Sequence, residues 1–271
     1  MKEQFIRADW FNVCSLVVFS LMAKILLIYC FWIGYDAPDP YQVFGADEAF
    51  WHELGVNVKD HLQDKGFVSC VLNLEKVTGT IAYGYPFFIG LVLSVFGDSV
   101  FFVLCAKQIV YAFGCLCFYG FSLHYFRSKK VAAIGLVFCL IYPPIVLNGV
   151  SLFRIEIMFT LTSLTCYAGI KSATAKRFLP QAIYLLIALS SLLFLLTFRL
   201  NAAAALLLFL GLLFLHERKM GFLLLLFAIP FVELLLAPIL GITGFVHYSI
   251  IFIDRAFVAG LSLYEMVFGM I

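Results

Sequence analysis

The chain has 271 residues, of which 64% are hydrophobic, 17% are aromatic and only 13% are charged. A soluble domain of this size is about half apolar and a quarter charged, so the composition excludes a water-soluble globular enzyme, and it equally excludes a disordered chain. The formal net charge is +2, and no basic run is longer than Arg127-Ser128-Lys129-Lys130, which argues against a nucleic-acid partner. We therefore expect an all-α, polytopic membrane protein.

Long uncharged stretches predict seven transmembrane helices in a single domain that covers residues 1–271. A crossing needs about 20 mainly apolar residues. The first apolar segment contains one charge, Lys24, which we expect to reach an interface through its long side chain. This segment is too long for the core of a signal peptide, so we interpret it as a retained helix. The predicted crossings are 11–34, 99–126, 131–148, 155–171, 179–198, 200–216 and 220–241.

The loop 35–98, between the first two crossings, contains two further helical segments. Within 47–65 apolar residues recur at helical spacing, which predicts an amphipathic helix lying on the membrane surface. The segment 84–97 is short for a crossing, so we expect an interfacial or re-entrant helix on the same side. The tail 243–271 falls on that side as well.

The distribution of charge orients these predicted helices. Half of the sixteen acidic residues lie within residues 36–75 of the loop after the first crossing: Asp36, Asp39, Asp47, Glu48, Glu53, Asp60, Asp64 and Glu75. Ten of the eighteen bases precede the first crossing or lie in turns on the opposite side: Lys2, Arg7, Arg127, Lys129, Lys130, Lys171, Lys176, Arg177, Arg218 and Lys219. Because basic residues favour the cytoplasmic side, we expect a cytoplasmic N-terminus and an outer loop 35–98.

Some charged residues remain on the outer side or within predicted crossings, where an ionisable group is costly and marks a functional candidate. Asp47 opens the amphipathic helix, where it is either a helix cap or a reacting carboxylate. The bases could hold a phosphate, and a carboxylate could deprotonate a hydroxyl group. The candidate residues are Asp47, Glu48, Lys107, Arg154, Glu156 and Arg199.

Four patches carry a resemblance to a known family. They are GADEAFWHELG at 45–55, GYPFFIGLVLSVFGD at 84–98, YPPIVLNGVSLFRIEIMFT at 142–160 and, more weakly, TFRLNAAAALL at 197–207. In order and spacing they resemble the GT-C glycosyltransferases, the polytopic group that contains protein O-mannosyltransferases and lipid A aminoarabinose transferases. Members of this family share a module of seven crossings.

The resemblance implies an inverting glycosyltransferase that moves a sugar from a polyprenyl-phosphate carrier to a hydroxyl acceptor on a glycan, lipid or protein. It implies a bacterial cytoplasmic (inner) membrane, with the active site on the periplasmic or outer face. Two acids at one site would allow a divalent cation, Mg²⁺ or Mn²⁺, through oxygen ligands without requiring one.

The resemblance also implies roles for the candidate residues. Asp47 would be the catalytic base, or would position the acceptor or a metal. Glu48 would lie beside it, and Glu156 would be the second acid of the site. The bases that would hold the carrier phosphate are Lys107, Arg199 and Arg154.

Two departures from the family pattern keep other functions open. The 84–98 segment has one proline where many relatives have two, and most relatives are far longer than this chain. One alternative is a non-catalytic scaffold or lipid-binding subunit that works with a partner subunit. Another is a small transporter or flippase, although the sequence has no evident internal repeat of the kind common in that class.

Overall fold

The computed structural model describes residues 2–33, 46–80, 83–142, 146, 152–198 and 200–216. Within these residues the structure is helical and contains no strand. Among the described residues, three helical segments are long and apolar enough to cross a membrane: Trp10–Cys30, Val100–Phe126 and Phe178–Leu196. The expectation of an all-α membrane protein is confirmed at this level, and the count of seven crossings stays a prediction.

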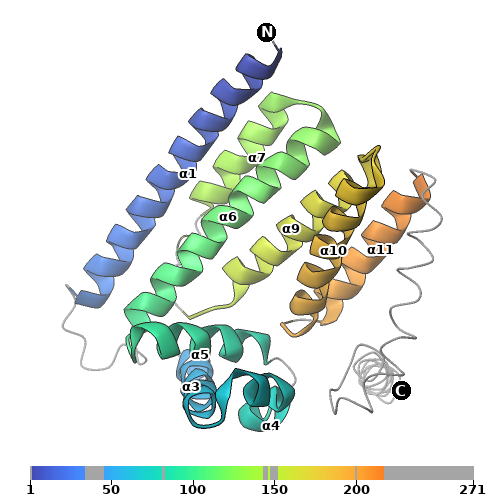
Figure 1. The fold of residues 1–271 in the computed structure, drawn as a ribbon. Helices are drawn as coiled ribbons and strands as arrows, with labels where there is room; N and C mark the ends of the chain where they lie inside the picture. Colours follow the sequence, from blue (N-terminus) through green and yellow to red (C-terminus); the bar gives the residue numbers. More distant parts are fainter. Residues whose placement is uncertain are drawn as a thin grey trace, which may run out of the picture.

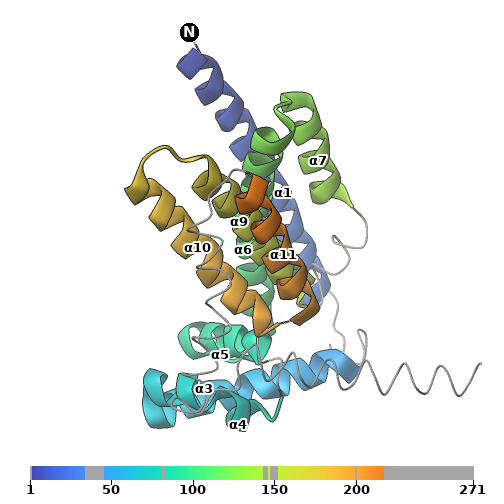
Figure 2. The same cartoon turned by 90° about the vertical axis from the view of Figure 1, so that its right-hand side faces the viewer.

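Six helices lie side by side as a bundle (Figures 1 and 2). Helix α6 is at its centre and packs against α1, α7 and α9, while α10 and α11 pack against α9. The bundle helices are α1 (Lys2–Ile33), α6 (Val100–Phe126), α7 (Lys129–Ile141), α9 (Ile155–Thr174), α10 (Phe178–Leu196) and α11 (Leu200–His216).

Three other helices, which we call the platform, lie across one end of the bundle (Figure 1). They are α3 (Ala46–Leu72), α4 (Leu74–Thr78) and α5 (Gly84–Phe96). Helix α3 is broken by Gly66, whose φ of 81° and ψ of 168° are not helical. The predicted helix 47–65 therefore ends one residue before a real kink, and the predicted helix 84–97 corresponds to α5.

Glycines allow the close approach of α3 and α5. A Cβ atom on Gly90 would lie 2.6 Å from Val58 Cγ1, and a Cβ on Gly55 would collide with Ile89. Only a residue without a side chain lets two helix backbones approach this closely. The other end of α5 is held to the bundle, because the Gly84 amide donates to the Thr197 carbonyl at 3.2 Å.

An ion pair also fixes the platform to the start of α6. Lys59 in α3 lies 2.5 Å from Asp98, in the loop between α5 and α6. The hydrogen bond and the negative charge of Asp98 raise the pKa of Lys59.

Most of the predicted helix bounds agree with the structure to within three residues, with exceptions at the end of 131–148 and the start of 11–34. Helix α7 ends at Ile141, within the predicted crossing 131–148, of which residues 143–145 and 147–148 lie outside the described residues. Tyr142, which follows, has a ψ of 116°. Pro143 comes next in the sequence, and a proline disfavours the helical conformation in the residue before it. At the N-terminus, α1 begins at Lys2, ahead of the predicted crossing 11–34. The predicted crossing 220–241 and tail 243–271 lie outside the described residues.

Candidate functional site

A buried ion pair lies inside the bundle near the platform. Lys107 Nζ in α6 is 3.5 Å from Glu156 Oε1 in α9, and both side chains are 0% exposed. Glu156 belongs to the first turn of α9, where the free amide groups and the helix dipole favour a negative charge. Lys107 also donates to the Phe153 carbonyl at 3.3 Å. The pair thus fastens the beginning of α9 to α6.

The platform is attached at the same place. The hydroxyl of Tyr85 in α5 donates to the Phe153 carbonyl at 3.4 Å, the same oxygen that Lys107 contacts. The Tyr85 ring packs edge-on against Trp51 of α3, with 5.8 Å between the ring centroids. One carbonyl before α9 therefore accepts from both the platform and the bundle.

Arg154 joins three elements at this position. It is the N-cap residue of α9 and is half-buried. Its guanidinium lies 5.1 Å from the centroid of the Trp51 ring, a cation–π contact with α3. It also donates to the Phe198 carbonyl at 3.3 Å, in the turn between α10 and α11. We call the group formed by Trp51, Tyr85, Lys107, Arg154, Glu156 and Phe198 the junction cluster.

The remaining sequence candidates flank the junction cluster along the chain. Asp47 and Glu48 lie in the first turn of α3, with Asp47 one helical turn before Trp51. Their side chains are outside the described part of the structure. Arg199 is also outside it, directly after Phe198 in the sequence. The structure thus brings together Lys107, Arg154 and Glu156, which the sequence could only place on one side of the membrane.

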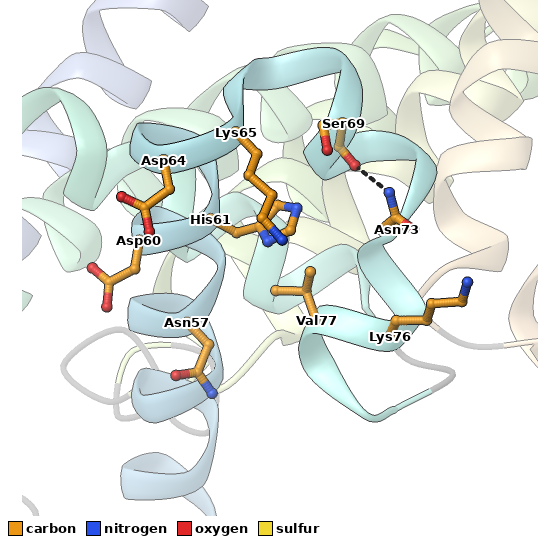
Figure 3. A pocket seen from close by; sticks show the side chains of 9 residues that line it. All are labelled: Asn57, Asp60, His61, Asp64, Lys65, Ser69, Asn73, Lys76 and Val77. Atoms are coloured by element: carbon orange, nitrogen blue, oxygen red, sulfur yellow. Dashed lines mark hydrogen bonds between the residues drawn. The ribbon is translucent and has the colours of Figure 1, made fainter.

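A second feature, which the sequence did not reveal, is a polar pocket of about 560 Å³ in the platform (Figure 3). Figure 3 shows the residues that line it, which come from α3 and from the segment containing α4: Asn57, Asp60, His61, Asp64, Lys65, Ser69, Asn73, Lys76 and Val77. The four-residue spacings of Asp60 with Asp64 and of His61 with Lys65 are visible in the sequence, but they also fit the solvated face of any amphipathic helix. The lining offers hydrogen-bond donors and acceptors and carries charges of both signs.

Within the described ranges, no three His, Cys, Asp or Glu side chains gather closely enough to hold a metal ion.

His52, on the first half of α3, is partly buried, and this burial lowers its pKa.

No family model, curated protein or solved structure matches this chain. A functional assignment therefore depends on its own residues and contacts.

Proposed function

We propose that this chain is a seven-span glycosyltransferase of the GT-C type, which moves a sugar from a polyprenyl phosphate to a hydroxyl acceptor. The observation that carries the proposal is the junction cluster. Arg154 and the buried Lys107–Glu156 pair meet the platform there, and Asp47 lies one helical turn from the Trp51 ring that contacts Arg154. An enzyme with a membrane-bound donor needs charged groups at such a boundary between a bundle and a surface helix.

In this proposal the two arginines hold the carrier phosphate. Arg154 is half-buried at the start of α9, and Arg199 follows Phe198, whose carbonyl Arg154 contacts. A guanidinium group binds phosphate oxygens in a two-pronged manner and keeps its charge when partly buried. Two such groups would also stabilise the charge that the phosphate gains when it leaves the sugar.

Lys107 and Glu156 act in this proposal as positioning residues. Both are closed off from solvent and contact each other, so neither presents a free charge to a ligand. They fix the first turn of α9 against α6, and Arg154 lies two residues before Glu156. Their effect on the donor phosphate is exerted through Arg154.

The reaction is a single displacement. The Asp47 carboxylate takes the proton of the acceptor hydroxyl as its oxygen attacks the anomeric carbon. The bond between that carbon and the phosphate oxygen breaks, and the polyprenyl phosphate leaves with the bonding electrons. The products are the inverted glycoside and the carrier phosphate, and the proton stays on Asp47 until solvent removes it. Glu48 would keep the first turn of α3 acidic.

The arrangement of charge supports the proposed orientation. The basic turns at residues 127–130 and 171–177 lie at the end of the bundle opposite the platform, together with the N-terminus of α1 (Figure 1). With the basic end in the cytoplasm, the platform faces the periplasm or the outside. The proposed location is the bacterial cytoplasmic membrane.

The test compares parent and Asp47→Asn cells for lipid-linked sugars and surface glycans by mass spectrometry. We expect the variant to accumulate a polyprenyl-phosphate sugar and to lack one glycan residue, with transfer in isolated membranes reduced by about 10²–10⁴-fold. Glu53→Gln, an exposed acid on the same helix, is the matched control and should behave like the parent. Normal transfer by Asp47→Asn would refute the role of Asp47.

The closed Lys107–Glu156 pair is also compatible with a non-catalytic scaffold or lipid-binding subunit. That alternative is favoured if cells that lack the gene show unchanged lipid-linked sugars and unchanged surface glycans. A change in the location of the lipid-linked sugar across the membrane, with no change in its structure, would favour a flippase.

A further inference from the structure

Lys24 is a buried cation in the middle of a membrane-spanning helix. It lies in the Trp10–Cys30 segment of α1, and its side chain is 6% exposed. The expectation that it extends to an interface is wrong, because its ammonium group points inward, 4.1 Å from the centroid of the Tyr111 ring in α6. Among the described residues its Nζ has no hydrogen-bond partner.

The charges around Lys24 do not balance. Lys107 and Glu156 are its charged neighbours, so the described part of this interior holds two ammonium groups and one carboxylate. Glu156 already contacts Lys107 at 3.5 Å. A charge buried in apolar surroundings is very unfavourable unless an opposite charge accompanies it. One further anion near Lys24 would balance these charges.

A groove between α1 and α7 is lined in part by this lysine. Helices α1 and α7 both pack against α6, and a cavity of about 390 Å³ lies between them. The hydroxyl of Tyr111 donates to the Cys139 carbonyl at 2.6 Å, which holds α7 in place beside the cation–π contact. Apart from Lys24 and Ser20, the lining is apolar, with Leu16, Phe19 and Ala23 on one wall and Val137, Leu140 and Ile141 on the other.

We propose that this groove binds the hydrocarbon chain of an anionic lipid, with the negative headgroup, a phosphate or a carboxylate, at Lys24. The groove is a slot between two helices, which suits a slender chain better than a helix. Leu16 is two turns from Lys24 toward the N-terminus, about 12 Å at 1.5 Å per residue. The bound chain would run from Lys24 along α1 toward Leu16, away from the platform. This site would exist whether or not the chain transfers a sugar.

The experiment uses the full chain in phosphatidylcholine nanodiscs with a photoactivatable hexadecyl phosphate as the probe. Cross-linked peptides are identified by mass spectrometry, and the corresponding neutral alcohol is the control probe. We expect the phosphate probe to label the α1 and α7 peptides at least ten times more than the alcohol does. Millimolar inorganic phosphate should not compete, because it has no chain to fill the groove.

Three variants separate the charge from the groove. Lys24→Met should lower groove labelling at least tenfold, while Lys24→Arg should keep it. Ala23→Trp, which keeps the lysine and fills the slot, should also lose the labelling. Leu186→Trp, at an exposed position of α10, is the matched control and should label like the parent.

The proposal is overturned if Lys24→Met and Ala23→Trp both label within twofold of the parent. Displacement of the probe by inorganic phosphate overturns the lipid assignment in favour of a small-anion site. Displacement by a synthetic polyleucine helix with one glutamate, but not by its glutamine counterpart, overturns it in favour of a partner helix. Labelling should persist in Asp47→Asn, which separates this site from the proposed reaction.

Discussion

Removal of Lys107 should destabilise the protein strongly, because it leaves the Glu156 carboxylate buried without its ion-pair partner. Both side chains are 0% exposed, so water cannot replace the lost contact. Breaking a buried pair from one side costs about 3–5 kcal/mol. At about 2–4 °C per kcal/mol, Lys107→Met should lower the unfolding midpoint by about 6–20 °C. The bond from Lys107 to the Phe153 carbonyl is lost as well.

The assay heats the detergent-solubilised protein and measures the fraction that still elutes as a monodisperse peak in size-exclusion chromatography. The double variant Lys107→Met, Glu156→Gln removes both charges, so it should recover at least half of the lost midpoint. Lys130→Met, at an exposed position in the first turn of α7, should stay within about 0.5 kcal/mol of the parent. A midpoint for Lys107→Met within 2 °C of the parent would refute the reasoning, and so would a double variant that loses the sum of both single effects.

Three further predictions concern the platform. Gly90→Ala should weaken the packing of α3 against α5, cost about 1–3 kcal/mol of stability and make limited proteolysis in α3 faster. Gly135→Ala is the control, because a Cβ there meets only the ring of a phenylalanine at 3.1 Å, and it should not change proteolysis in α3. Burial lowers the pKa of His52, so as the pH falls the unfolded chain takes up the proton before the folded protein does, and the free energy of unfolding should decrease below pH 6.5. In His52→Gln the unfolding midpoint should change less between pH 7.5 and 5.5 than it does in the parent. Asp98 raises the pKa of Lys59, so their contact stabilises the folded protein below pH 10.5, and this stabilisation is lost as the pH rises above that value. Asp98→Asn should remove this pH dependence of the unfolding midpoint, and its effect on the midpoint should be larger at low salt.

The platform could be predicted from the sequence because its signals are local. Apolar residues at helical spacing gave the helix 47–65, and Gly66 is the kink that ends its straight part. The segment 84–97 was too short to cross, and α5 does lie across the end of the bundle (Figure 2). Helix α7 ends at Ile141, inside the predicted crossing 131–148, and the backbone restriction before Pro143 is a local signal for that helix end.

The orientation of Lys24 could not be predicted in the same way. A lysine in an apolar helix can extend toward the headgroups or turn into the bundle, and the choice depends on what lies beside it. Here the neighbour is the ring of Tyr111, on a helix distant in the sequence and placed only by tertiary packing. Net charge and hydropathy contain no information about that contact.

The sequence predicted several charged residues of the junction cluster, but it did not predict that Lys107 and Glu156 contact each other. Lys107 and Glu156 were both candidates, yet nothing in the sequence joined them. The structure supplies the reason, because α6 and α9 both begin at the platform end (Figure 1). Side chains on a helix tilt toward its N-terminus, so Lys107, in the second turn of α6, leans back toward the first turn of α9.

The two proposals place their anions at different positions. The Lys107–Glu156 pair connects to Arg154 and the platform through the Phe153 carbonyl, while Lys24 faces the groove between α1 and α7. A phosphate held by Arg154 would reside at the boundary of the bundle, and an anion at Lys24 would reside within it. If a single polyprenyl phosphate occupied both places in turn, Lys24→Met would reduce transfer as well as labelling. If the sites are independent, Lys24→Met abolishes the labelling and leaves transfer intact, and the groove then holds a structural lipid that compensates a charge the fold has already buried.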